Sequence, residues 1–320
     1  MAISCKITDM GWGLPHQSAD WFAMTGGREV QDKKGKRNML QYSDILLAVD
    51  YDRTLTGPDS KVPARNVEAV RWFMEQGGAF TINTGRSWNL AERLLGRVPI
   101  NAPLLLFNGA AAVDNGKILY SHVIDAPMWE MVMAAADAFP ELNVEIQGLE
   151  DHYIVRPKES FVALYESMKW HWTEAVPGTD LGPFVKFAVY GVAHTPVLGD
   201  MYQGTEEEYA RIRELDRFIR DRWGDKVDLC YAAPRILDVQ PKGIHKGLAA
   251  RELQQKLGRK LLVCAGDADN DIPMLDAADF AFCPADAVVA DRYENVCCCA
   301  DGAVADVIYK KIPEILQIQP

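Results

Sequence analysis

The chain has 320 residues, of which 48% are hydrophobic and 25% charged, and its formal net charge at pH 7 is −11. These values are typical of a globular protein, and the length predicts about two domains. The negative charge argues against nucleic acid or an anionic membrane as a partner, because both attract positively charged surfaces.

No apolar run approaches the roughly 20 residues that a membrane-spanning helix needs. Residues 1–10 lack the basic-then-apolar pattern of a secretion signal. The seven cysteines contain no Cys-x-x-Cys pair, which argues against a zinc site or a disulfide framework. We therefore expect a reduced, cytoplasmic protein, with Cys297 to Cys299 in a buried strand.

Residues 45–49 form a short, wholly apolar run that is followed by two acids, Asp50 and Asp52. Such a run predicts a strand buried on both faces of a parallel sheet. Acids at the carboxyl end of that strand lie at the edge where open α/β sheets bind ligands. Two carboxylates so close together repel each other, and oxygen ligands suit a hard cation such as Mg²⁺. The stretch therefore indicates a metal-assisted carboxylate site.

Helices and strands alternate after this first strand. The apolar spacing predicts a helix at 63–76, a strand at 79–83, a helix at 87–96 and a strand at 104–107. Two strand–helix–strand crossovers in succession predict a parallel, doubly wound sheet.

The pattern changes in the middle of the chain. Asp114, Asn115 and Gly116 separate two apolar runs and predict a β-hairpin. Beyond the hairpin we expect helices from 128, at 159–172 and at 206–222, with strands at 143–146, 153–156, 185–190, 227–231 and 236–240. Such a mixture, without regular alternation, is typical of a separate α+β module.

Regular alternation then resumes. We expect helices at 246–257, 271–277 and 304–315, and strands at 261–265, 280–283 and 296–299. The predicted fold is thus α/β, a Rossmann-like doubly wound parallel sheet with an inserted α+β domain. The predicted domains are a core at 41–112 and 240–320, an insert at 113–239, and an N-terminal extension at 1–40 to which we assign no role.

Four sites with reactive side chains lie at strand ends or helix starts of this core. They are Asp50 with Asp52, Thr84, Lys246, and Asp267 with Asp271. Here the sequence resembles the haloacid dehalogenase-like superfamily of phosphotransferases, and its insert resembles the cap of the Cof-type (subfamily IIB) phosphatases. The motifs that carry the resemblance are Asp50-Tyr51-Asp52-Arg53-Thr54, Thr84-Gly85-Arg86, Asn108-Gly109-Ala110, Lys246-Gly247 and Gly266-Asp267-Ala268-Asp269-Asn270-Asp271.

The resemblance implies a phosphatase that works through an aspartyl-phosphate. Asp50 would be the nucleophile, and Asp52 would act first as general acid and then as general base. Thr84 and Lys246 would hold the phosphoryl oxygens. Lys242 is a rival for the lysine role, and Lys246 is preferred because Lys-Gly at a helix start matches the family pattern.

The resemblance also implies a Mg²⁺ site. Its ligands would be Asp50, the backbone carbonyl of Asp52 and Asp267, while Asp271 would support the metal through water or orient Lys246. The alternative is that Asp267 and Asp271 are first-turn acids beside a helix dipole. Thr84 has a similar alternative as a helix cap.

The substrate that the resemblance implies is a small phosphorylated metabolite, most often a sugar phosphate, bound by a monomer or homodimer. Further residues of the motifs, and cations of the insert, are candidates for contacting the substrate: Arg53, Gly85, Arg86, Asn108, Gly109, Asn270, Arg156 and Lys186, with Arg235 as a further cation. Arg53 stands where the family often has glycine. Exposed surface charge is the alternative for the insert cations.

Three rival functions remain open at this point. A phosphomutase or phosphotransferase would use the same aspartyl-phosphate with an alcohol as acceptor. A phospho-receiver switch would order its motifs differently and lack the insert. A metal-binding D-x-D glycosyltransferase would give no reason for Thr84 and Lys246.

Overall fold

The computed structural model of the protein describes residues 40–91, 97–125, 128–149, 151–176, 178–181, 183–191 and 204–317. The predicted N-terminal extension therefore lies outside the described residues except for Leu40. The same holds for residues 92–96 of the helix predicted at 87–96. No helix within the described ranges combines the length and the apolar character that crossing a membrane requires.

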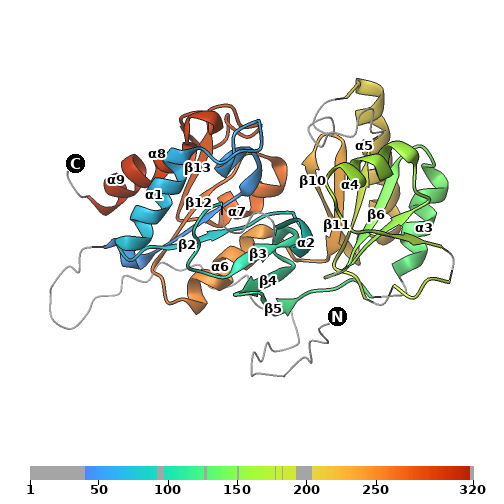
Figure 1. Ribbon diagram of the computed structural model, residues 1–320, viewed down its shortest axis with the longest axis horizontal. Helices are drawn as coiled ribbons and strands as arrows, with labels where there is room; N and C mark the ends of the chain where they lie inside the picture. Colours follow the sequence, from blue (N-terminus) through green and yellow to red (C-terminus); the bar gives the residue numbers. More distant parts are fainter. Residues whose placement is uncertain are drawn as a thin grey trace. The chain divides into compact units, whose positions relative to one another are not determined.

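The core is built on five parallel strands (Figure 1). Their order across the sheet is β14 (Glu294–Val296), β13 (Phe280–Pro284), β12 (Leu261–Ala265), β1 (Ile45–Val49) and β2 (Ala79–Ile82). A parallel bridge between Asn83 and Leu105 brings β3 (Leu104–Leu106) alongside β2. β3 in turn pairs antiparallel with β4 (Ala111–Asp114), and β4 with β5 (Lys117–Ser121).

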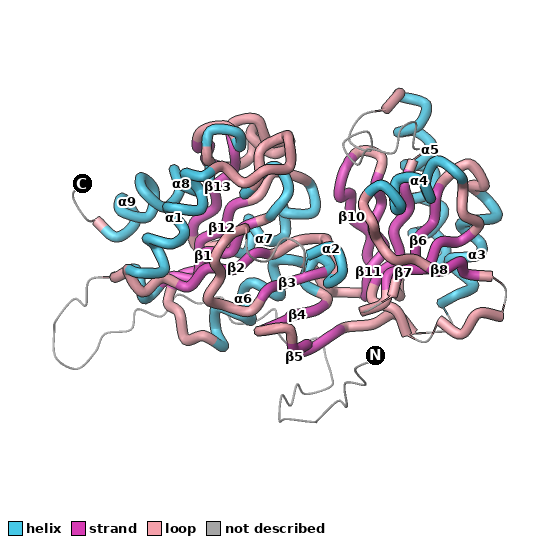
Figure 2. The backbone as a smooth tube through the Cα atoms, in the orientation of Figure 1, coloured by secondary structure: helices cyan, strands magenta, loops and turns pink. Residues whose placement is uncertain are grey.

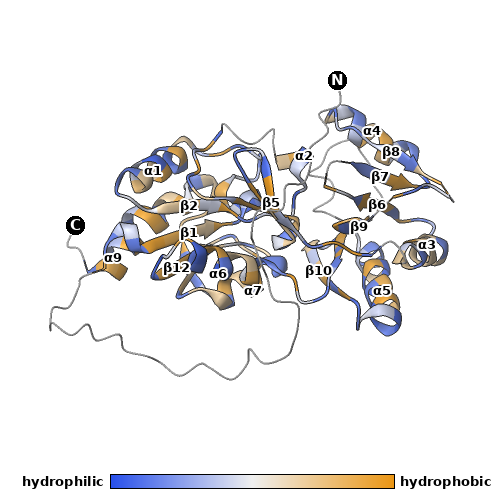
Figure 3. Ribbon diagram, turned by 90° about the horizontal axis from the view of Figure 1, so that it is seen from below, coloured by the Kyte–Doolittle hydropathy of each residue, from blue (hydrophilic) through white to orange (hydrophobic). Residues whose placement is uncertain are grey.

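Helices cover both faces of the parallel sheet because its central strand is apolar on both sides (Figure 3). Leu47 and Val49 of β1 belong to the apolar cluster formed with α1 (Ala64–Glu75), α8 (Ala303–Asp306) and α9 (Ile312–Leu316). Leu46 and Ala48 belong to the opposite cluster, with α6 (Lys246–Lys256) and α7 (Ile272–Ala277). This confirms the predicted doubly wound, Rossmann-like core.

The inserted cap is a six-stranded sheet with helices (Figure 2). The strand order is β10 (Val227–Ala233), β11 (Ile236–Pro241), β9 (Lys186–Tyr190), β6 (Asn143–Gln147), β7 (His152–Val155) and β8 (Thr173–Ala175). All neighbours are antiparallel except β7 and β8. The boundaries predicted for the insert, 113–239, stay a prediction.

The two faces of the cap sheet differ in character. Val144 and Ile146 of β6 pack with α3 (Trp129–Ala138) and α5 (Glu206–Trp223) in one apolar cluster. The alternate residues of the same strand, Glu145 and Gln147, lie on the other face, because successive side chains of a strand point to opposite sides. Helix α4 (Glu159–Ser167) belongs to the apolar cluster of this second face, together with Ile154 of β7.

Two of the predicted elements are wrong in extent. The strand expected at 296–299 ends at Val296. Beyond it, Cys299 donates its backbone N–H to Asp286 at 2.9 Å within a 3₁₀ turn, which takes the chain away from the sheet. The helix expected at 159–172 ends at Ser167, because Lys169 adopts a left-handed backbone with φ of 56°.

Candidate active site

The register of the parallel sheet brings the predicted motifs to one edge. Val49 of β1 pairs with Ala265 on one side and Ile82 on the other, so the next residues of all three strands emerge together. The backbone N–H of Asp50 donates to the carbonyl of Ala265 at 2.9 Å, which carries the pairing one residue beyond the strand. Asp50 and Asp267 therefore lie at the same edge of the sheet, where open α/β sheets bind ligands.

The turn after β1 returns Thr54 to this edge. Arg53 adopts a left-handed backbone with φ of 59°, and its N–H donates to Thr56 Oγ1 at 3.0 Å. The buried Thr54 hydroxyl then donates to Asp267 Oδ1 at 3.1 Å. The turn thereby ties the first acidic motif to the last one.

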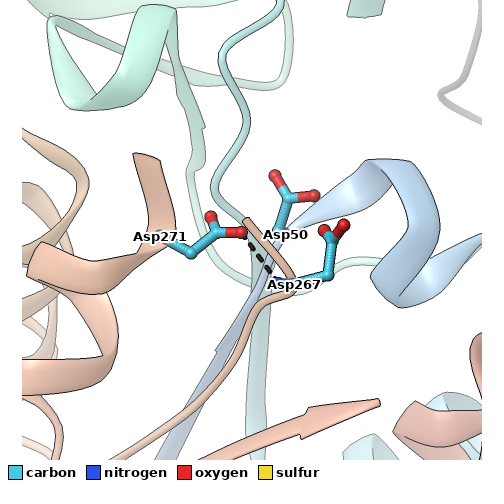
Figure 4. Close-up of side chains that lie close together, drawn as sticks. All are labelled: Asp50, Asp267 and Asp271. Carbon is cyan, nitrogen blue, oxygen red and sulfur yellow. Dashed lines mark hydrogen bonds between the residues drawn. The ribbon is translucent and has the colours of Figure 1, made fainter. Parts of the chain in front are cut away.

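Three buried carboxylates form the centre of the site. Each of Asp50, Asp267 and Asp271 offers a carboxylate oxygen, and these oxygens all lie within 4.8 Å of one another (Figure 4). Lys246 Nζ donates to Asp50 Oδ1 at 2.5 Å and to Asp271 Oδ1 at 2.6 Å. Three carboxylates and one ammonium leave a formal charge of −2 when all four groups are ionised.

Asp271 is held more firmly than its two neighbours. Its Oδ2 accepts the backbone N–H groups of Asp267 at 2.9 Å and of Ala268 at 3.1 Å, and the first of these bonds is drawn in Figure 4. On Gly266, a Cβ would lie 2.5 Å from the Cβ of Asp271, so only glycine permits this close approach. The loop at 266–271 therefore fixes the position of the Asp271 carboxylate beside the carboxylates of Asp50 and Asp267.

The packing of α6 on α7 places the lysine. A Cβ on Gly247 would lie 2.0 Å from the carbonyl oxygen of Pro273, which explains why glycine follows Lys246. Lys246 is fully buried at the start of α6. Lys242 instead binds Asp228 at 2.7 Å and is half-exposed. The structure thus brings Lys246, and not Lys242, to the carboxylates.

The electrostatics of the cluster call for a cation. Burial raises the pKa of Asp50 to about 7, although Lys246 opposes the rise. Burial, with the charges of Asp50 and Asp271, raises the pKa of Asp267 well above its usual range. Burial would lower the pKa of Lys246, but Asp271 and Asp50 outweigh it and raise that pKa. The lysine alone does not neutralise three carboxylates, and a divalent cation would.

Asp52 is not one of the three clustered carboxylates and binds Arg86 instead. Its two oxygens accept from Arg86, at 2.8 Å from Nε and 2.6 Å from Nη2. The backbone N–H of Arg86 donates to Thr84 Oγ1 at 3.2 Å, two residues before α2 (Trp88–Ala91) begins. Asp52 and Thr84 both line the same pocket as Asp50.

The cap closes the far side of this pocket. Lys186 of β9 donates to the carbonyl of Gly85 at 2.8 Å and to Asp238 Oδ2 at 2.9 Å. Asn108 Nδ2 donates to the same Asp238 oxygen at 2.9 Å, and Asn108 Oδ1 accepts from Asn270 at 3.2 Å. A chain of hydrogen bonds thus joins the cap to three of the core motifs.

Of three other residues predicted to contact the substrate, one lines the pocket and two do not. Arg53 lines the pocket. Gly109 follows Asn108 with φ of 93°, and its carbonyl accepts from Tyr120 at 3.3 Å. Arg156 does not line the pocket, since its guanidinium binds the carbonyl of Ala136 and the carboxylate of Asp137.

The sequence reasoning missed a polar network in the cap. His152 Nδ1 lies 2.5 Å from Glu145 Oε1, and its Nε2 makes a 2.7 Å hydrogen bond with Ser87 Oγ in the core. Glu145 Oε2 accepts from Gln147 at 3.0 Å and from Tyr190 at 2.8 Å. The sequence feature that could have indicated this network is the alternation of polar and apolar residues at 143–147, which predicts that one face of the strand is polar.

Residues 47–290 match the sequence profile described as haloacid dehalogenase-like hydrolase. The chain belongs to this family. The match spans all the motifs around the carboxylate cluster, so the resemblance proposed from the sequence is confirmed. As a haloacid dehalogenase-like hydrolase, the protein is an enzyme, and the phosphatases among its relatives support phosphoric monoester hydrolysis as its class of reaction.

Several relatives of this hydrolase are known. An HMP-PP phosphatase of Serratia proteamaculans is 25% identical over 240 residues, which cover 72% of this chain and 80% of the relative. A haloacid dehalogenase-like hydrolase from B. subtilis has the same fold, with a TM-score of 0.68, 17% identity and coverage of 83% of this chain and 99% of its own. A sugar phosphatase of HAD subclass IIB also has this fold, with a TM-score of 0.66 and 18% sequence identity. The match covers 86% of this chain and 99% of the sugar phosphatase.

Proposed function

We propose that the protein is a Mg²⁺-dependent phosphatase that hydrolyses a small phosphorylated metabolite through an aspartyl-phosphate on Asp50. The observation that carries the proposal is the buried cluster of three carboxylates around one lysine at the edge of the sheet. Such a cluster is costly to bury unless a cation and a phosphoryl group use it.

The donor set fits Mg²⁺. All three side chains offer oxygen, which is the ligand atom that this hard cation prefers. Lys246 occupies one oxygen of Asp50, and Thr54 occupies one oxygen of Asp267. Within the described ranges, the second oxygen of each accepts no hydrogen bond. Asp50 and Asp267 would hold the ion, and Asp271 would support it. The bound ion would screen the carboxylates from an approaching anionic phosphate.

Asp50 is the proposed nucleophile. Its carboxylate attacks phosphorus, a new P–O bond forms to Asp50, and the bond from phosphorus to the alcohol oxygen breaks. Asp52 gives its proton to the departing alcohol and later takes one from the water that hydrolyses the aspartyl-phosphate. Lys246 and Thr84 hold the equatorial oxygens of the phosphoryl group.

The cap would choose the leaving group and exclude water from the reaction. Lys186 and His152 support this role, because both bind the core segment that carries Thr84 and Arg86. The sugar phosphate expected from the sequence stays a prediction. The relatives named above carry two different substrates in their names, HMP-PP and sugar phosphate. Family membership gives no support to the receiver or glycosyltransferase alternatives.

Phosphate release tests the proposal. Wild type and Asp50→Asn are assayed on acetyl phosphate and a panel of phosphorylated metabolites, each with Mg²⁺ and with chelator. We expect release that requires both Mg²⁺ and Asp50. Steady turnover by Asp50→Asn would contradict the nucleophile assignment. Transfer of phosphate to added alcohols without release would favour the phosphotransferase alternative.

A further inference from the structure

The core segment 84–87, which carries Thr84 and Arg86, is held by hydrogen bonds from two parts of the molecule. The core supplies the first two bonds. Asn108 donates its backbone N–H to the carbonyl of Thr84 at 3.0 Å. Phe107 donates its backbone N–H to the carbonyl of Arg86, also at 3.0 Å. These two bonds fix the first and the third residue of the segment.

The cap holds the second and the fourth residue of the same segment. Lys186 of β9 donates to the carbonyl of Gly85 at 2.8 Å. His152 of β7 forms a 2.7 Å hydrogen bond with Ser87 Oγ, and its other ring nitrogen lies 2.5 Å from Glu145 of the cap. The side chains of Lys186, His152 and Ser87 are buried, so water competes poorly for these bonds. The segment is therefore fully anchored only while the cap is packed against it.

The nucleophile and the metal ligands do not depend on the cap in this way. Among the described residues, every side-chain hydrogen bond of the three clustered carboxylates comes from Lys246, from Thr54 or from the backbone of the loop at 266–271. All of these groups belong to the core. The core alone therefore arranges the carboxylate cluster.

The proposed general acid differs from the cluster in this respect. Within the described ranges, the carboxylate of Asp52 accepts hydrogen bonds from Arg86 alone, through two nitrogens of one guanidinium. A two-pronged bond of this kind fixes the orientation of a carboxylate. Since Arg86 belongs to the segment that the cap helps to hold, the orientation of Asp52 depends on the cap.

We propose that His152 and Lys186 are positioning residues for the general acid. They hold segment 84–87 from the cap, the segment aligns Arg86, and Arg86 aligns Asp52. Attack by Asp50 is then possible without the cap, whereas proton donation to the departing alcohol requires it. The inference rests on the proposed phosphatase activity and gives the cap a task besides the choice of the leaving group.

Two esters of similar size separate proton donation from the attack on phosphorus. Benzyl phosphate loses a poor leaving group, so the benzyl oxygen must receive the proton of Asp52 as its bond to phosphorus breaks. The oxygen of 4-nitrophenyl phosphate departs as a stable phenolate and needs no proton. The ratio of kcat/KM for the benzyl ester to kcat/KM for the 4-nitrophenyl ester therefore reports how well Asp52 is aligned.

Ser87→Ala tests the bond to His152. We expect this variant to lower the ratio about tenfold or more, because general acid catalysis is lost while the attack by Asp50 is retained. A merely structural role of the bond would lower kcat/KM equally for both esters and leave the ratio unchanged. Ser167→Ala is the matched control on α4 and should not change the ratio, since Ser167 Oγ donates locally to the carbonyl of Leu164.

A double variant tests the second anchor. Lys186→Met combined with Asp238→Asn removes the bond to Gly85 together with both charges of the buried ion pair, so that neither charge is left unpaired. This protein should also show a lower ratio. It decides the question by itself if Ser87→Ala does not fold.

Pre-steady-state kinetics give an independent readout. The water that hydrolyses the aspartyl-phosphate gives its proton to Asp52, whereas formation of the aspartyl-phosphate from 4-nitrophenyl phosphate needs no acid. In Ser87→Ala the second step should slow more than the first, so that aspartyl-phosphate accumulates and 4-nitrophenolate is released in a burst. Equal slowing of both steps would contradict the proposal.

The outcomes separate the two proposals. An unchanged ratio in folded Ser87→Ala and in the double variant would overturn the positioning role and leave the phosphatase intact. A ratio that falls equally in Ser167→Ala would also overturn it. No hydrolysis of either ester or of acetyl phosphate by wild type would overturn both proposals.

Discussion

His152 of the cap and Ser87 of the core are joined by a hydrogen bond of 2.7 Å between Nε2 and Oγ, and both side chains are buried. Ser87 directly follows Arg86, which holds Asp52. The position of the cap is therefore linked to the segment that carries the proposed phosphoryl-binding and acid-orienting groups.

Ser87→Ala should loosen this contact. The variant leaves the buried His152 Nε2 without its hydrogen-bond partner, at a cost of about 1–3 kcal/mol. We expect the amides of β7 to exchange hydrogen at least several-fold faster than in wild type, measured by mass spectrometry. Ser167→Ala on α4 is the control, because Ser167 Oγ donates locally to the carbonyl of Leu164. Unchanged exchange in Ser87→Ala would show that the contact does not restrain the cap.

Arg86→Lys should expose the purpose of the Asp52–Arg86 pair. Lysine keeps the charge but loses the two-pronged geometry, so the carboxylate of Asp52 is no longer oriented. If Arg86 orients the general acid, kcat/KM should fall about tenfold or more for an alkyl phosphate. The fall should be smaller for 4-nitrophenyl phosphate, whose leaving group needs no proton. Equal losses on both esters would instead assign Arg86 to phosphate binding.

Thr54→Val should weaken metal binding without touching a ligand. The Thr54 hydroxyl donates to Asp267 Oδ1, and outer-shell bonds of this kind change metal affinity by about 10–100-fold. We expect a weaker Mg²⁺ affinity in titration calorimetry. Thr173→Val is the isosteric control, because Thr173 is exposed on β8. Equal Mg²⁺ affinity in Thr54→Val and wild type would contradict a role of the Thr54 hydroxyl in positioning Asp267 for the ion.

Asp267→Asn should stabilise the metal-free protein while it impairs turnover. The pKa of Asp267 is raised by burial, so its contribution to folding stability falls as pH rises from about 3.9, the unfolded value, towards the folded value. Removing the charge should raise the free energy of unfolding at pH 7 on the order of 1 kcal/mol. Urea unfolding in chelator measures this. A variant less stable than wild type would contradict the repulsion argument.

Glu145 should make the cap sensitive to acid. Burial opposes its ionisation, but His152 and two tyrosine hydroxyls outweigh burial and lower the pKa of this carboxyl to about 2. A lowered pKa contributes stability above the unfolded pKa, and this contribution is lost as pH falls from about 4.5 towards 2. The contribution at neutral pH is at most about 3 kcal/mol.

Urea unfolding of wild type and Glu145→Gln between pH 7 and pH 3 checks this prediction. The difference in stability between the two proteins should be largest at neutral pH and shrink in acid. Glu207→Gln, on the exposed first turn of α5, is the control with the same chemical change and no buried partner. A difference that does not depend on pH would contradict the assigned pKa.

The sequence determined the core and the order of its motifs. Strands such as 45–49 are apolar throughout because both faces are covered, and this pattern is local enough to be read without a structure. The carboxyl ends of parallel strands share one edge, so Asp50 and Asp267 could be predicted to meet although 217 residues separate them. Lys246 was selected over Lys242 on the family pattern, and the structure brings Lys246 to the carboxylates.

Only the tertiary structure decided what surrounds this centre. Local periodicity shows which residues of a strand share a face, but not which face of the cap meets which segment of the core. The pairing of Asp52 with Arg86 and the bond between His152 and Ser87 therefore could not be predicted from spacing. The same holds for Lys186, whose charge is satisfied by Asp238 from a neighbouring strand, because ion pairing depends on distances that folding alone creates.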